Sequence, residues 1–370
     1  MPTLIVSPFT PRPGSGRGLR TVGVARALAC LDDVEIAYVE FDGTRVAEPL
    51  ADDARVTLRA LHASRGVRRA VTYVRARVAG TPRAFARGVS PELVGLDVAR
   101  FDRVVADGPT AAAALALVAR NPHVVYNAHN LESTFRLELW DGARHYGSVG
   151  DLRAFEVRLL TTAYETWVPT REEARLALEL VPSARVRYVP NVVDVQGIAP
   201  VSPNTREARV LFVADFSYEP NRNAARFLVD EVAPKLWRLA PDARLTLVGR
   251  ALPPPGTTDQ RVEILGYVDD LADAYARSTC VVVPLLVGGG SPLKLVEAMA
   301  YGLPVVATGR AASSLEGAED GVHYLEANDA EQFAMTLARA LSGEESDIGR
   351  NGRLLAEAEF SIEALVGHLR

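Results

Sequence analysis

The sequence predicts an α/β protein of two Rossmann-like domains, each built on a doubly wound parallel sheet, that face each other across a cleft. The chain has 370 residues, more than one ordinary hydrophobic core contains. Strand and helix patterns alternate almost throughout. The alternation stops once, at residues 196–206, where Pro, Gly, Ser and Asn replace the apolar periodicity, and then begins again.

Short apolar segments predict the strands of a first domain at residues 1–195. These segments are 4–7, 34–41, 56–61, 103–106, 123–126, 166–168 and 186–189. Helical patterns lie between them, at 19–31, in an alanine-rich stretch that reaches residue 120, at 150–163, and once more after residue 168.

The second domain is expected at residues 207–351, after the linker at 196–206. Its predicted strands are 209–213, 245–248, 262–265, 280–286 and 305–308. Predicted helices cover 223–239, the stretch between Ser291 and Gly302, 329–342 and 345–369.

The most informative segment is a glycine loop between a strand and a helix. Gly288, Gly289 and Gly290 follow the apolar strand, Ser291 is a natural N-cap and Pro292 a natural first helical residue. Ligands of open α/β sheets bind at the carboxyl ends of the strands, and a helix N-terminus attracts anions. The segment therefore indicates a phosphate site.

Two polar side chains stand on the otherwise apolar helix after this loop, Lys294 and Glu297. Their spacing of three residues places them on one helix face. The chain has 41 basic residues, yet Lys235 and Lys294 are its only lysines, which favours a specific role for Lys294. The alternative is a surface Lys–Glu pair beside an ordinary helix cap.

The segment resembles the donor-sugar loop of the retaining GT-B glycosyltransferases of family 4, and especially a subgroup with a Gly-Gly-Gly loop. The resemblance implies that the loop, Leu293 and Lys294 hold a nucleotide diphosphate and that Glu297 binds its ribose. A second glutamate common in the family is replaced here by Gly289. The family uses a nucleotide-diphosphate sugar as donor substrate, with no further cofactor and no required metal. Its final helix, here 352–370, usually crosses back onto the first domain.

The same resemblance suggests further contacts in the second domain. Arg222 is a candidate second cation for the leaving phosphate, and it equally fits a solvated arginine at a helix start. Arg250 has the same two interpretations. Tyr267 and Val268 follow a strand whose backbone pairs with the nucleobase in the family.

Three residues of the first domain are candidates for the transferred sugar or the acceptor. Gly16 lies in the glycine loop 13–18 after the first strand, which alternatively is a simple strand-to-helix turn. His129 follows a strand end, where site residues gather, although a single histidine is more often structural. Asp107 stands where the family often has a sugar-contacting histidine, and an N-cap role for Asp107 is slightly favoured.

Net charge, cysteine usage and the length of apolar runs limit the functional class and the cellular location of the protein. A net charge of −5 argues against general nucleic-acid binding. Cys30 and Cys280 lie in apolar patterns, which favours free buried thiols in a reducing compartment. No apolar run reaches the length of a membrane span, and the adjacent acidic pairs lack the further ligands of a metal site. We expect a cytoplasmic protein.

Residues 55–87 form a basic region without acidic side chains. Within it Val67, Ala70, Val71, Val74 and Val78 form a helical apolar stripe, with arginines on the other faces. The favoured interpretation is a core-packed helix with a solvated arginine face. The alternative is peripheral contact with anionic lipid at the inner membrane face, or with an anionic acceptor.

Together these features predict a metal-independent, retaining glycosyltransferase of the hexosyltransferase type. Its partners would be a nucleotide-sugar donor and an acceptor hydroxyl on a natural product, a glycan or a lipid-linked molecule. Two alternatives stay open, a GT-B sugar-nucleotide epimerase or hydrolase and a non-catalytic nucleotide-sugar-binding protein.

Overall fold

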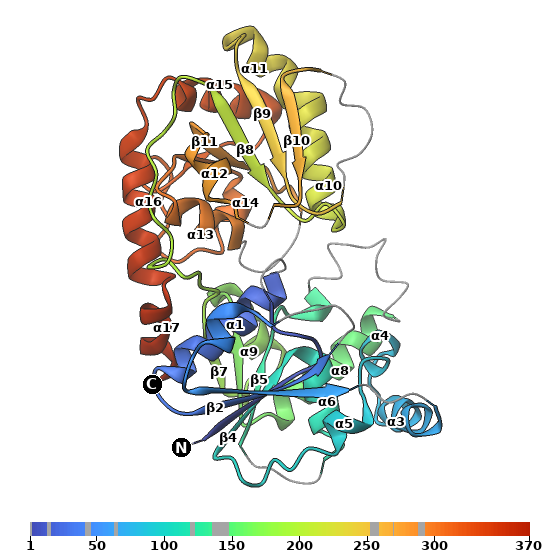
Figure 1. Cartoon of the computed structure of the whole chain (residues 1–370). Coiled ribbons are helices and arrows are strands. Elements are labelled where there is room, and N and C mark those ends of the chain that lie inside the picture. The colour runs from blue at the N-terminus through green and yellow to red at the C-terminus, as the bar shows by residue number, and fades with distance from the viewer. Residues whose placement is uncertain are drawn as a thin grey trace. The chain divides into compact units, whose positions relative to one another are not determined.

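A computed structural model of the chain forms two compact units, the first made of Met1–Asn191 and Leu365–Arg370 and the second of Val192–Ala364 (Figure 1). It describes residues 2–12, 16–40, 46–62, 66–118, 123–134, 148–251, 259–268, 270–287 and 293–370. No helix within these ranges is long and apolar enough to cross a bilayer.

The first unit contains a seven-stranded parallel sheet in the order β3-β2-β1-β4-β5-β6-β7. Its strands are β1 Thr3–Ser7, β2 Val34–Glu40, β3 Val56–His62, β4 Arg103–Asp107, β5 Val124–Asn127, β6 Glu165–Val168 and β7 Val186–Tyr188. Its helices are α1 Gly16–Ala29, α2 Glu48–Ala51, α3 Val67–Val78, α4 Arg83–Ala86, α5 Pro91–Val94, α6 Gly108–Leu115, α8 Val149–Thr162 and α9 Arg171–Leu180.

The second unit contains a six-stranded parallel sheet in the order β10-β9-β8-β11-β12-β13. Its strands are β8 Arg209–Val213, β9 Arg244–Val248, β10 Val262–Gly266, β11 Cys280–Val283, β12 Val305–Ala307 and β13 Leu325–Glu326. Its helical segments are α10 Glu219–Arg226, the π-helix Phe227–Val232, α11 Ala233–Leu239, α12 Ala272–Ala276, α13 Leu293–Ala300, α14 Gly309–Ala312, α15 Ala330–Leu341 and α16 Ser346–Glu359.

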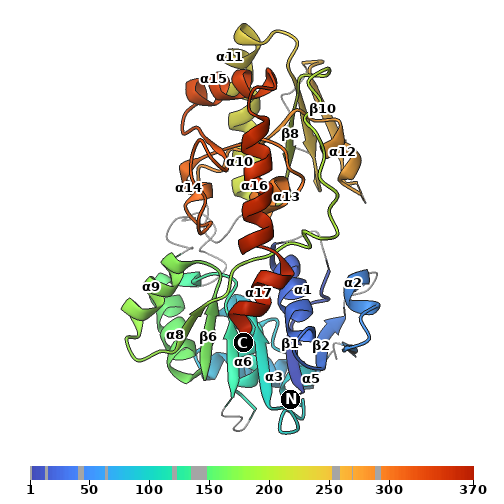
Figure 2. The same cartoon turned by 90° about the vertical axis from the view of Figure 1, so that its left-hand side faces the viewer.

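These two sheets confirm the predicted α/β class. Every residue of β1 and of β11 is buried, as expected when helices cover both faces of a parallel sheet. Figures 1 and 2 show helices against both faces of each sheet. The helix α17, Ile362–Leu369, ends in the first unit, where the His368 ring lies 5.4 Å from that of Tyr188.

Two predicted helices are broken, each for a local reason. The expected helix 223–239 contains Pro234, which cannot donate an α-helical hydrogen bond, and the chain widens into a π-helical turn just before it. The expected helix 345–369 divides at Phe360, because Ser361 accepts a hydrogen bond from the Ala364 amide at 3.1 Å and starts α17.

The two cysteines differ in exposure. Cys280 is buried in β11, as expected, but Cys30 is exposed because α1 ends one residue before it. Both are free thiols.

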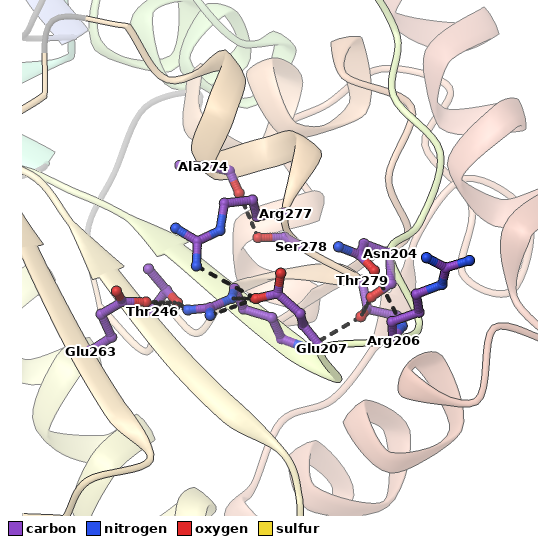
Figure 3. Close-up of polar contacts among 10 residues, drawn as sticks. Asn204, Arg206, Glu207, Thr246, Glu263, Ala274, Arg277, Ser278 and Thr279 are labelled. Atoms are coloured by element: carbon purple, nitrogen blue, oxygen red, sulfur yellow. Dashed lines mark hydrogen bonds and ion pairs between the residues drawn. The ribbon is translucent and has the colours of Figure 1, made fainter.

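At the amino-terminal end of the second sheet, a network of polar side chains connects neighbouring strands (Figure 3). The buried Arg209 at the start of β8 binds Glu207, Glu263 on β10, and the Thr246 hydroxyl on β9, at 2.6 Å. The Thr279 hydroxyl accepts from the Arg209 amide at 3.2 Å and donates to the Asn204 carbonyl at 2.5 Å. The segment that enters β8 is thus bonded to neighbouring strands of its sheet.

At the opposite, carboxyl end of this sheet, Gly249 allows its own backbone to lie close to that of Ala214, after β8, and Gly266, at the end of β10. Its amide donates to the Gly266 carbonyl at 2.7 Å, and its φ is 148°. A Cβ atom at Gly249 would lie 1.7 Å from the Ala214 carbonyl oxygen. Only glycine therefore fits between the ends of β8 and β10 without displacing backbone.

We expect Gly249→Ala to lower the free energy of unfolding by about 2–4 kcal/mol, through backbone strain and the clash with Ala214. Gly266→Ala is the matched control, because Gly266 also has positive φ, at 68°, but no atom within 4 Å of an added Cβ. The control should lose only about 1–2 kcal/mol. Chemical denaturation followed by circular dichroism measures both, and equal losses would contradict the role of the close approach.

Candidate functional site

In the second unit, the helix α13 presents the two polar side chains that the sequence singled out. Gly288, Gly289, Gly290, Ser291 and Pro292 lie outside the described residues. Leu293 begins α13 and is buried, whereas Lys294 and Glu297 are half-buried. Neither side chain lies on a fully exposed helix face, so the interpretation as a solvated surface pair is not supported.

Lys294 connects α13 to the segment after β8. Its Nζ donates to the Asn221 Oδ1 at 2.5 Å and lies 6.0 Å from the Phe212 ring centroid. The Asn221 side chain is itself held in place, because its Nδ2 donates to the Asp215 backbone carbonyl at 2.8 Å. Burial lowers the pKa of Lys294 to about 8, although the charge of Asp215 acts in the opposite direction. An anion beside this ammonium would favour its charged form.

Glu297 lies one helical turn beyond Lys294, against two stacked tyrosines. The Tyr275 hydroxyl is 3.5 Å from the Glu297 Oε2, and the Tyr275 and Tyr301 rings stack with centroids 3.8 Å apart. Burial raises the pKa of Glu297 to about 7, and the hydrogen bond from Tyr275 only partly opposes this. A ligand that donates hydrogen bonds to Glu297 would therefore favour its carboxylate.

The loops after β8, β9 and β10 meet at the same sheet edge. The Phe216 amide donates to the Arg250 carbonyl at 2.9 Å, and the Arg250 guanidinium lies 4.9 Å from the Tyr267 ring centroid. Tyr267 is 57% exposed and Val268 is half-buried. This exposed ring and its stacked arginine form a surface that a planar group can contact.

Arg222 supports the loop that leads from β8 into α10. Its Nη1 donates to the Phe216 carbonyl at 3.1 Å and to the Ser217 carbonyl at 2.6 Å. The guanidinium thus satisfies backbone acceptors in the loop before its helix, which is a structural use of the charge.

In the first unit, Asp107 is the centre of a buried polar cluster at the sheet's carboxyl edge. One of its oxygens accepts from the Ser7 hydroxyl at 3.0 Å and from the Thr21 hydroxyl at 2.7 Å. The other accepts from the Asn127 side-chain amide at 3.1 Å and bonds the His129 Nε2 at 2.8 Å. These contacts join β1, α1, β5 and the segment after β5.

The pKa of Asp107 lies below its ordinary value. Burial acts to raise this pKa, but the charge of His129 and the hydrogen bonds from His129, Thr21 and Ser7 outweigh it. The slightly favoured N-cap role is not realised by the side chain, because no helix N–H of α6 binds it. The carboxylate oxygens of Asp107 bind the four side chains named above instead.

His129 is buried between Asp107 and the turn into α6. Its ring lies 6.1 Å from that of Phe9, and a Cβ atom at Gly108 would come within 3.0 Å of its Cε1. The ring is therefore held on several sides.

Gly16 is the first residue of α1, and an added Cβ there would meet no atom within 4 Å.

Two buried glutamates that sequence reasoning missed hold the backbone around His129. Glu156 on α8 accepts from the Glu132 amide at 2.6 Å and from the Ser133 amide at 3.2 Å. Glu173 on α9 accepts from the Leu131 amide at 3.0 Å. Burial raises the pKa of each to about 7, against these hydrogen bonds. The available signal was a glutamate at position 156 among the apolar residues of one helix face.

Arg20 on α1 is a further buried charge that the sequence did not single out. Its Nε donates to the Asn127 Oδ1 at 3.0 Å, and its Nη1 donates to the Val189 carbonyl at 2.8 Å. Burial lowers its pKa to about 10, while Glu173 and Asp107 favour its charge. It connects the Asp107 cluster to the end of the sheet at β7.

The structure thus gathers the predicted residues in two groups. Asp107 and His129 are in direct contact in the first unit. In the second unit Lys294 is bonded to Asn221 on α10, the helix that also carries Arg222, and Glu297, Arg250 and Tyr267 lie in the same unit. Within the described ranges, no three His, Cys, Asp or Glu side chains are arranged to hold a metal ion.

Within the second unit, one segment is similar to a known family of domains. Residues 207–343 match the family model described as Glycosyl transferases group 1. This segment contains every predicted residue of the second group. No curated protein sequence matches the chain.

Solved structures resemble the whole chain. Sucrose-phosphate synthase from Thermosynechococcus elongatus has a TM-score of 0.75 at 18% identity, covering 100% of this chain and 97% of its own. HepE from Anabaena, in complex with UDP and glucose, has a TM-score of 0.70 at 16% identity, covering 99% and 98%. Trehalose 6-phosphate synthase from Burkholderia multivorans has a TM-score of 0.65 at 16% identity, covering 99% and 95%. With the two parallel sheets, these likenesses show a GT-B fold.

Removal of the Asp107 carboxylate should destabilise the first unit. We expect Asp107→Ala to lower the free energy of unfolding by about 3–5 kcal/mol, because the buried Asn127 and His129 lose the carboxylate oxygen that they share. Since the folded pKa is depressed, the contribution of Asp107 is present above its ordinary pKa and is lost as pH falls through the folded value.

The control for this prediction is Asp102→Ala, an exposed aspartate just before β4, which should change stability by less than about 0.5 kcal/mol. Urea denaturation at neutral and acid pH compares the two variants with the unmodified protein. A loss at Asp107 no larger than that at Asp102 would show that the cluster does not depend on the carboxylate.

Proposed function

We propose that the chain is a glycosyltransferase of the hexosyltransferase type, which moves a sugar from a nucleotide-diphosphate sugar to an acceptor hydroxyl. One observation carries the proposal. Lys294 and Glu297 are half-buried one turn apart on α13, inside the segment that matches the Glycosyl transferases group 1 model. A cation and a carboxylate so placed suit a diphosphate and the ribose hydroxyls attached to it.

The donor has the chemistry of a sugar joined to a nucleoside diphosphate, and UDP-glucose is the first probe to try. HepE, which shares the fold, was solved in complex with UDP-glucose. In the proposed complex the loop 288–292 and Lys294 hold the diphosphate, and Glu297 accepts from the ribose. Tyr267, Val268 and Arg250 lie beside the base.

The proposed reaction breaks the bond between the sugar's anomeric carbon and the phosphate oxygen. The acceptor oxygen forms a new bond to that carbon with retained configuration, and the acceptor proton leaves with the phosphate. Negative charge grows on the departing diphosphate, where the Lys294 ammonium stabilises it. Arg222 contributes by fixing the loop that leads into α10, the helix that carries Asn221, the partner of Lys294. The proposal requires no bound metal.

In the first unit, the proposed contacts with a sugar hydroxyl come from His129. The Asp107 carboxylate accepts from a proton on the His129 Nε2, so the opposite ring nitrogen, Nδ1, is the one that would meet the sugar. Asp107 then acts by fixing the ring rather than by touching the sugar. Gly16, at the start of α1, leaves room for a substrate to approach the backbone.

Calorimetric titration with UDP, GDP, ADP and dTDP, followed by product analysis with the corresponding sugar nucleotides, tests the proposal. We expect one nucleoside diphosphate to bind and its sugar nucleotide to donate to an added acceptor. Free monosaccharide alone, or an epimerised donor, would favour an epimerase or hydrolase. Binding without turnover on any acceptor would favour a nucleotide-sugar-binding protein.

Nucleotide affinity should depend on pH through Glu297. Since the raised pKa of Glu297 is about 7, its carboxylate forms, and binding strengthens, as pH rises through that value. Above about 8 the free Lys294 loses charge and binding weakens. Glu297→Gln should reduce affinity by about ten- to a hundredfold at pH 8 and remove the part of the acid limb that Glu297 causes.

Titration of the nucleoside diphosphate over this pH range in both proteins checks the prediction. The nucleotide's own terminal phosphate ionises near pH 6 in both cases, so the difference between the profiles reports Glu297. Glu331→Gln, an exposed glutamate of the same unit, is the control. Identical profiles for all three proteins would remove Glu297 from the site.

Lys294→Ala should lower kcat by about two to three orders of magnitude with a smaller change in KM, because the charge it meets develops in the transition state. Lys235→Ala is the control, as the other lysine of the chain is exposed and paired with Glu331. Steady-state kinetics with the identified donor measure both. A Lys294→Ala variant as active as the control would place this lysine outside the reaction.

A further inference from the structure

The helix α3 exposes its apolar side to solvent. Val67, Val71, Val74 and Val78 are 80%, 52%, 56% and 84% exposed. Their spacing of four, three and four residues places them on one helix face. The core-packed interpretation of this stripe is therefore wrong.

The buried face of α3 is the opposite one. Thr72 and Ala76 are buried, and Tyr73 packs against the core of the first unit. The small side chains of Thr72 and Ala76 let the helix lie close to α4 and α5, its neighbours within the unit. Amphipathic spacing alone does not reveal this, because the stripe of valines has the period of an ordinary core face.

Arginines border the valine stripe on both sides. At 100° per residue, Arg68 and Arg75 fall on one edge and Arg77 on the other, and all three are exposed. Of these three, Arg77 also donates to the Thr81 carbonyl at 2.6 Å, and Arg69, on the side opposite the valines, donates to the Arg87 carbonyl at 3.3 Å. From residue 54 to residue 91 the chain contains nine arginines and no acidic residue.

We propose that α3 lies in the surface of an anionic lipid bilayer, with the valine stripe below the headgroups and the arginines at the level of the lipid phosphates. Three features favour this occupant. The exposed stripe has strongly polar edges, as interfacial helices do. The charge of the edges is entirely positive, which complements an anionic surface. A second copy of the chain would instead bring like-charged arginines together across a twofold axis.

The geometry also suits a flat partner. In Figure 1 α3 lies at the periphery of the first unit. The four valines are exposed, whereas Thr72 and Ala76 on the opposite side of the helix are buried. The side of an exposed peripheral helix is a shape that a planar surface can contact. The inference is independent of the proposed function, because vesicle binding requires neither donor nor acceptor.

Vesicle co-sedimentation with the full chain tests the proposal. The probes are phosphatidylcholine vesicles with and without about one-third phosphatidylglycerol, at low and physiological salt. We expect binding to the anionic vesicles only, weaker at higher salt. A Val71→Ser/Val74→Ser variant should bind at least about tenfold more weakly, and Arg68→Gln/Arg75→Gln about fivefold more weakly per arginine.

The control variant is Leu239→Ser/Met335→Ser, whose side chains are 55% and 52% exposed in the second unit and so match Val74 and Val71. It should bind like the unmodified protein, and circular dichroism should show all variants folded. No sedimentation, or equal sedimentation that neither valine nor arginine substitution changes, would overturn the proposal. So would a valine-dependent dimer in analytical ultracentrifugation that binds no vesicles.

Discussion

The parallel arrangement of both sheets is the constraint on which the candidate sites depend. All strands of such a sheet end at the same edge, so the residues that follow them are brought together whatever their separation in sequence. In the first unit this edge collects Ser7, Asp107, Asn127 and His129. In the second it collects the backbone at Gly249 and Gly266 and the helix that carries Lys294. The opposite end of the second sheet is closed by the Arg209 network and is purely structural in its contacts.

Burial gives the groups at these edges their chemical character. It moves the pKa of Lys294 down and that of Glu297 up, so both approach neutrality before a ligand arrives. In the proposed complex a nucleoside diphosphate would supply an anionic partner for Lys294 and hydroxyl donors for Glu297. Binding would then restore both charges, and its free energy would include this reorganisation. In the first unit the charge of His129 and the hydrogen bonds from His129, Thr21 and Ser7 outweigh the desolvation of Asp107, which stays an acceptor.

Much of the fold was predictable, because alternation of short apolar strands with helices leaves few arrangements other than parallel sheets. The breaks at Pro234 and Phe360 depend on local competition between hydrogen bonds, which the apolar pattern does not record. Lys294 and Glu297 stood out because polar residues on an apolar helix are conspicuous. The roles of Glu156 and Glu173 depend on backbone amides far away in sequence, so residue type alone did not indicate them. The valine stripe of α3 shows that periodicity identifies two faces without saying which is buried.

Lysine labelling tests the central claim most directly, because the chain has only two lysines. An amine-reactive ester is added with and without a saturating concentration of whichever nucleoside diphosphate binds most tightly, and mass spectrometry follows each lysine separately. The account predicts that the nucleotide slows modification of Lys294 severalfold and leaves the exposed Lys235 unchanged. Modification of Lys294 at the same rate with and without bound nucleotide would contradict a diphosphate site at α13.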